Sequence, residues 1–127
     1  MANSILLNQA LISGNYSGLP LDVDSNLLST TIVNGLTVVK TADMAVWASG
    51  YLTYTITIDN QSSEDYVTPT LTDTLDILQI TLVANSVTVG GSVAVYTFDS
   101  LTGLLTVVLP TVADTDLLEI TYQVQMV

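Results

Sequence analysis

Apolar and polar residues alternate with a period of two through most of residues 35–127, and this pattern limits the fold more than any other feature. Residues 51–59 show it most clearly: Leu52, Tyr54, Ile56 and Ile58 share one face, and tyrosine or threonine occupies positions 51, 53, 55 and 57. Successive side chains of a strand point to opposite faces of its sheet, so one face of this strand is expected to pack in the core and the other to face solvent. Turn residues interrupt the alternation repeatedly, which predicts an all-β sandwich or barrel.

Further strands are expected over residues 36–41, 67–76, 77–83, 104–109 and 118–126. Pro69 favours an edge position for the strand over residues 67–76, because proline gives no ladder hydrogen bond. Residues 86–95 read as a β-hairpin with Gly90 and Gly91 at its turn, since glycine accepts the positive φ angles of the primed turns. A second turn is expected over Asp99–Gly103.

Residues 1–34 do not follow this pattern and are predicted to lie outside the domain. We divide the chain into an N-terminal arm with a flexible joint (1–20), a connecting segment (21–34) and the β-sandwich domain (35–127). The apolar stretch 4–12 fits either a strand or a short helix capped by a serine.

The joint is assigned to the segment 13–20 because it is rich in helix and strand breakers, with Gly14, Gly18 and Pro20 as the hinge residues. A short strand fits Leu27 to Val33, before Asn34 and Gly35 turn into the domain.

Charge and composition exclude several classes of function. Twelve acidic residues face one lysine, Lys40, with no arginine, histidine or cysteine, so the net charge is −11. A nucleic-acid or anionic-membrane binder needs clustered cations, which this chain lacks. The commonest general base, the thiol nucleophile and the soft metal ligands are also missing. No carboxylate pair has a recognisable catalytic setting, so a non-enzymatic protein without cofactor or metal is expected.

Three features allow a sharper interpretation beside a plain one. Lys40 could form an intramolecular isopeptide bond, although an amphipathic structural lysine is the plainer interpretation. The segment Asp22–Asn26 resembles the start of a calcium loop, but Leu27 and Val33 stand where the loop's glycine and bidentate acid belong, so solvated turn carboxylates are favoured. Trp47 and the six tyrosines could bind sugar, whereas aromatic residues in strands usually pack in the core or at its rim.

Several segments together resemble the conserved-repeat module known as domain of unknown function eleven, over about residues 35–127. The segments are Leu36-Thr-Val-Val-Lys-Thr-Ala-Asp43, Tyr51-Leu-Thr-Tyr-Thr-Ile-Thr-Ile-Asp-Asn60, Leu71-Thr-Asp-Thr-Leu75, Ser86-Val-Thr-Val-Gly-Gly91 and, at the end, Leu117-Leu-Glu-Ile-Thr-Tyr-Gln-Val124. The resemblance implies an immunoglobulin-like β-sandwich of about seven strands. It also implies a spacer or assembly role in prokaryotic surface proteins, with no catalytic residues.

The chain departs from that module in having one copy and an N-terminal arm, whereas such modules usually occur in tandem. A single copy must find its neighbours without a covalent link. The first residues lack the positive region and the uninterrupted apolar run of a Sec signal peptide. Single-copy relatives resemble components of appendages on bacterial endospores, which are freed by lysis of the mother cell. We therefore expect an extracellular location, on the cell or spore surface, reached without a Sec signal.

The arm suggests how copies would associate. Residues 3–12 of one subunit could add as a strand to a sheet edge of the next, because an open edge offers free N–H and C=O groups. The predicted interface residues are the apolar ones of this segment: Ile5, Leu6, Leu7, Ala10, Leu11 and Ile12. The alternative is that the arm folds back as an extra strand of its own domain.

The expected function is a subunit that assembles into a filament, because a head-to-tail contact that does not close gives an open polymer. The expected partners are copies of the same chain or a close paralogue, with a surface anchor protein as a further candidate. The alternative function is a monomeric adhesive module that recognises sugar or protein at a cell surface.

Overall fold

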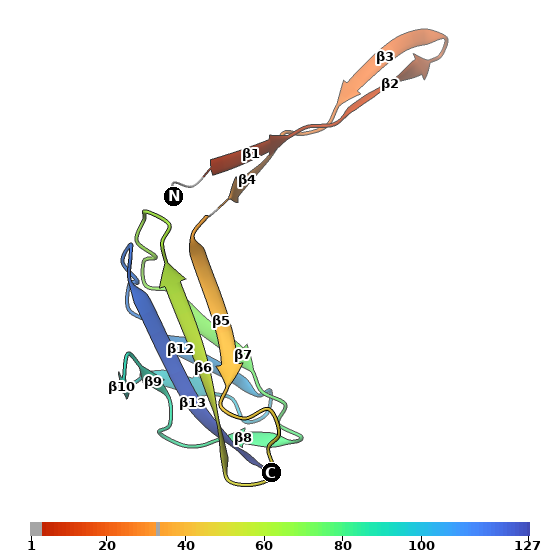
Figure 1. Cartoon of the computed structure of the whole chain (residues 1–127). Helices are drawn as coiled ribbons and strands as arrows, with labels where there is room; N and C mark the ends of the chain where they lie inside the picture. Colours follow the sequence, from red (N-terminus) through yellow and green to blue (C-terminus); the bar gives the residue numbers. More distant parts are fainter. Residues whose placement is uncertain (1–3, 33) are drawn as a thin grey trace.

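The computed structural model describes residues 4–32 and 34–127, and these residues form thirteen β-strands and no helix. The predicted all-β class is therefore confirmed. Figure 1 shows a β-sandwich body and a long two-stranded ribbon that projects from one end of it. The described residues contain no helix with the length and apolar character needed to cross a membrane.

The ribbon, which we call the arm, is built from the first four strands. These are β1 (Ser4–Asn8), β2 (Leu11–Tyr16), β3 (Leu19–Asp24) and β4 (Leu28–Ile32). β1 pairs with β4 to form the inner part, nearer the body, and β2 pairs with β3 to form the outer part (Figure 1). Both pairs are antiparallel, so residues 4–32 form one long hairpin.

The turn at the tip of the arm explains why the chain reverses there. Ser17 and Gly18 both have positive φ, 51° and 81°. Two consecutive residues of this kind are typical of the two-residue turn whose twist matches that of the flanking strands. The segment 13–20, predicted to be a flexible joint, is therefore the tip of a hairpin, and this prediction was wrong. Breaker residues mark tight turns as well as loops.

A bulge separates the inner and outer parts of the arm. Residues 25–27 on the returning strand lie opposite residues 9–10, so the returning strand carries one residue more. The Ser25 backbone N–H donates to the Ala10 carbonyl at 2.9 Å, and the Ala10 N–H donates to the Ser25 Oγ at 2.9 Å. An extra residue of this kind bends the ribbon and increases its twist.

The remaining strands form the body: β5 (Leu36–Ala42), β6 (Tyr51–Asn60), β7 (Thr70–Thr74), β8 (Ile80–Leu82), β9 (Thr88–Val89), β10 (Ser92–Val93), β11 (Tyr96–Phe98), β12 (Leu104–Val108) and β13 (Leu117–Met126). One sheet has the order β10-β9-β13-β6-β5, with β8 also paired to β13, and the other has the order β11-β12-β7. The described body has nine strands rather than about seven, because residues 88–98 contribute three short ones.

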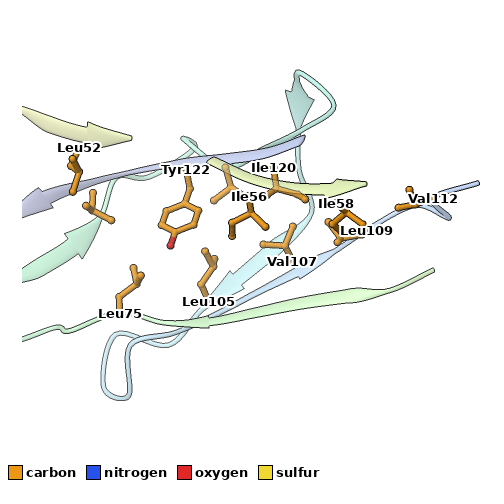
Figure 2. Close-up of a cluster of buried hydrophobic side chains, with 12 residues drawn as sticks. Leu52, Ile56, Ile58, Leu75, Leu105, Val107, Leu109, Val112, Ile120 and Tyr122 are labelled. Atoms are coloured by element: carbon orange, nitrogen blue, oxygen red, sulfur yellow. The ribbon is translucent and has the colours of Figure 1, made fainter. Parts of the chain in front are cut away.

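The core lies between these two sheets, as the alternation predicts. Leu52, Ile56 and Ile58 of β6 and Ile120 and Tyr122 of β13 face Leu105 and Val107 of β12 (Figure 2). Val124 of β13 belongs to the same buried cluster. The hairpin turn at Gly90 and Gly91 is also confirmed, with φ of 58° and 84°. The body is therefore a layered antiparallel sandwich with one hydrophobic core.

The arm leaves the body at a tightly built junction. The Gln61 N–H donates to the Gly35 carbonyl at 2.7 Å, and a Cβ on Gly35 would lie 2.4 Å from the Gln61 carbonyl oxygen. The fully buried Asn60 donates to the carbonyls of Glu64 and Val112, each at 2.8 Å. The Asn60 side-chain oxygen accepts from the Ser62 N–H and hydroxyl, so these hydrogen bonds order the loop beside Gly35.

Candidate assembly interface

The predicted interface residues are all solvent-exposed in the arm: Ile5, Leu6, Leu7, Ala10, Leu11 and Ile12. They lie on β1, on β2 and in the link between them, and the first three residues of the predicted arm lie outside the described part. The arm does not fold back as an extra strand of the sandwich, because β1 and β2 pair with β4 and β3. The segment is thus paired, but its large apolar side chains remain uncovered.

The outer part of the arm has one wholly apolar face. Directly opposite residues of an antiparallel pair project to the same face. The opposed pairs on this face are Ile12 with Val23, Gly14 with Leu21, and Tyr16 with Leu19. All five large side chains are exposed. We call these six residues the apolar arm face.

The reverse side of the same strands is mainly polar. Its opposed pairs are Leu11 with Asp24, Ser13 with Asp22, and Asn15 with Pro20. The outer arm therefore has one apolar face and one mainly polar face, like a pair of strands that packs on a core. In this chain, the described residues provide no core beneath it.

The inner part of the arm carries apolar side chains on both faces. Leu6 and Leu28 lie on one face, opposite Thr30 and Asn8 respectively, while Ile5 and Leu7 lie on the other. The one-residue bulge lies between this part and the outer one. The clean separation of apolar and polar faces is thus a property of β2 and β3 alone.

The three predicted hinge residues have separate positions in the hairpin. Gly14 lies within β2, and a Cβ placed on it would have no neighbour within 4 Å. Gly18 is in the tip turn, and Pro20 lies in β3 on the polar face. A glycine inside a strand often marks a close approach by another backbone or ligand, so Gly14 leaves a notch in the apolar arm face.

Sequence reasoning missed four of the six residues of this face. Tyr16, Leu19, Leu21 and Val23 were assigned to the joint and the connecting segment, whereas they form the apolar arm face together with Ile12. The signal was present in the spacing of Leu19, Leu21 and Val23 by two residues, directly after a Ser-Gly pair. A turn followed by period-two alternation predicts a returning strand.

A second cluster surrounds Lys40 at the edge of the body. Its Nζ lies 2.6 Å from Asp73 Oδ2, and the Tyr122 hydroxyl donates to the same oxygen. The ammonium group also lies 4.5 Å from the Tyr54 ring centre. Burial, followed by the hydrogen bond to Asp73, raises the pKa of Tyr122 well above its usual range. This ion pair joins β5 of one sheet to β7 of the other, which fits the structural interpretation of Lys40.

The other two candidates have plain surroundings. Asp22 and Asp24 lie on the polar face of the arm, and the described residues contain no group of three or more potential metal ligands. Trp47 packs against the core, and its buried indole nitrogen finds no hydrogen-bond partner in the part of the chain that is described. Core packing is thus its structural role.

Comparisons with protein-family models, curated proteins and solved structures give no match.

Proposed function

We propose that this protein is a non-catalytic structural subunit that associates with copies of itself, or with a close paralogue, into a filament. The observation that carries the proposal is the apolar arm face. Its apolar side chains all lie on one side of the strand pair, as in a sheet that packs on a core, yet they are exposed to solvent. The arm would dock on a neighbouring copy as a two-stranded ribbon. This refines strand donation, because β1 already has β4 as its partner.

Stability supports a docked arm. An isolated two-stranded ribbon is marginally stable in water and usually needs a third strand or a packed face. The free edges of β1 and β4 offer backbone groups for such a strand. A neighbouring subunit could supply both the cover and the backbone partners.

We also propose that the sandwich has an immunoglobulin-like ancestry and that the protein lies on the cell or spore surface. Both rest on the resemblance of residues 35–127 to the conserved-repeat module. An anchor protein would hold the first subunit of the filament. In this proposal the sandwich acts as a spacer, and the arm makes the connection.

Negative-stain electron microscopy and sedimentation velocity of the purified full chain test this function. We expect filaments above a critical concentration and monomers below it. Monodisperse monomers at every concentration up to the millimolar range would refute self-assembly, and an adhesive module would then be the better interpretation.

Salt should promote the assembly. Each subunit carries a net charge of −11, and like charges separated by more than about 10 Å are largely screened at 0.1 M salt. The critical concentration should therefore fall as sodium chloride or a divalent cation is added. An unchanged critical concentration between low and high salt would show that charge repulsion does not control assembly.

A further inference from the structure

The most exposed large apolar side chains of the described residues belong to loops and a chain end that lie at the end of the body opposite the arm. They are Val46, Leu78, Leu101 and Val127, each between 83% and 89% exposed. We call these four residues the distal pole. They come from four separate parts of the sequence, so their common location is set by the fold.

Hydrogen bonds and strand pairing place each of these segments at this end of the body. The Val127 N–H donates to the Gln79 carbonyl at 3.1 Å, which brings the last residue beside Leu78. The Leu75 N–H donates to the Gly103 carbonyl at 2.9 Å, which brings the turn containing Leu101 to the same end.

The loop with Val46 leads into β6, whose first residue pairs with Gln125 near the end of β13. Figure 1 shows this loop, β8 and the C-terminus at the end of the body away from the arm.

Leu78 and Leu101 lie in turns that are held by the same kind of hydrogen bond. Asp76 Oδ1 accepts the Leu78 N–H at 3.2 Å, and Asp99 Oδ1 accepts the Leu101 N–H at 2.9 Å. The hydrogen bond from Leu101 is the main cause that lowers the pKa of Asp99. Side-chain bonds of this kind fix the backbone of a turn, and both leucines project from such turns with exposed side chains.

We propose that the distal pole of one subunit receives the apolar arm face of the next, which gives a directional, head-to-tail contact. This inference rests on the proposed function and names the surface that accepts the arm. Since Lys40 is the single basic side chain of the sequence, opposite charges cannot supply the attraction between copies. Apolar burial and backbone hydrogen bonds remain as sources of attraction, and these two surfaces are exposed apolar ones at opposite ends of the molecule.

The outer arm is long enough to cross the distal end of a neighbouring body. β2 and β3 have six residues each, which corresponds to about 20 Å of strand. Four strands, β8, β13, β6 and β5, reach the distal end, and they span about 15 Å at the usual strand spacing. The outer arm can therefore lie across the whole end of a neighbouring sheet.

A symmetric pairing of two arms is the competing arrangement. It would cover two apolar arm faces and leave both distal poles in water. A head-to-tail contact covers an arm and a pole at each interface and repeats along the filament. The head-to-tail arrangement therefore accounts for both exposed surfaces.

Two full-length variants test the inference. The pole variant carries Leu78→Ser and Leu101→Ser, and the arm variant carries Ile12→Ser and Leu19→Ser. Each should raise the critical concentration at least about tenfold, the effect of about 1.4 kcal/mol. A control with Val93→Ser and Val95→Ser, at 73% and 76% exposure elsewhere on the body, should assemble like the wild type.

Mixing the two variants gives the decisive result. The intact arm of the pole variant should bind the intact pole of the arm variant, so sedimentation should show a 1:1 complex that does not grow. A pole variant that polymerises like the wild type, or a mixture that stays monomeric, overturns the inference. If the wild type itself never assembles, the proposed function fails as well, so the two failures can be distinguished.

Discussion

Ile12 and Leu11 are neighbours in β2 that differ mainly in the face to which they project. Ile12 lies on the apolar arm face opposite Val23, and Leu11 lies on the polar face opposite Asp24. They are 72% and 60% exposed, and neither belongs to the buried core or to the side chains packed against it. Replacing each in turn by threonine therefore isolates the role of the face.

The magnitude follows from the area that docking would cover. Complete burial of an isoleucine side chain contributes about 1.5–3 kcal/mol, and nearly three quarters of Ile12 is still exposed in the free subunit. Ile12→Thr should thus weaken each subunit contact by about 1–2 kcal/mol, which raises the critical concentration roughly five- to thirty-fold. Leu11→Thr should change it less than about twofold, because its face stays in water.

Light scattering and sedimentation velocity at fixed salt measure the critical concentration of each variant. Chemical denaturation should give both variants the wild-type free energy of unfolding, since the substituted side chains make no core contact. Equal effects of the two substitutions on assembly would refute the role of the apolar arm face. A larger effect of Leu11→Thr would show that the other face docks.

Three further outcomes follow from particular contacts. Gly18→Ala should destabilise the arm by about 1 kcal/mol, because Gly18 has a φ of 81°, whereas Gly14→Ala should not. Amide hydrogen exchange of the arm measures both effects, and equal effects would contradict the assigned tip turn. Tyr122→Phe should lower the free energy of unfolding by about 1–2 kcal/mol, through the lost hydrogen bond to Asp73. The raised pKa of Tyr122 means that the folded protein holds the phenolic proton more tightly than the unfolded chain does. The contribution of Tyr122 to stability is therefore complete below about pH 10 and declines above it by up to about 1.4 kcal/mol per pH unit. Tyr122→Phe should remove this decline in alkaline denaturation. Lys40 and Asp73 should remain an ion pair, so the intact mass should equal that of the sequence, and a mass lower by one water would show an isopeptide bond between them.

The body of the fold could be predicted because its signals are local. The alternation at Leu52, Ile56 and Ile58 determines which face of β6 is buried, and the Gly90–Gly91 turn determines the hairpin around it. The order of the strands could not be predicted in this way. Pairing between β6 and β13 joins residues far apart in the sequence, and period-two alternation is the same for every partner.

The arm was harder to predict because its returning strand has an irregular pattern. The bulge at residues 25–27 interrupts the alternation between Val23 and Leu28, so β3 and β4 do not read as one continuous strand. The distal pole gave no sequence signal at all. A single exposed leucine such as Leu78 is common at protein surfaces, and its meaning depends on neighbours that only the fold brings to it.

The proposed docking requires that the ribbon keep one strand register, and the bulge helps to set it. A one-residue slip of strand pairing moves every side chain to the opposite face, and a two-stranded ribbon without a core has little to prevent such a slip. Here the tip turn at Ser17 and Gly18 fixes the register of β2 and β3, and the hydrogen bonds between Ala10 and Ser25 fix the bulge at the other end. Between these two points the same side chains stay on the apolar arm face. An arm with a fixed register can present the same side chains to every neighbour, as a regular filament requires.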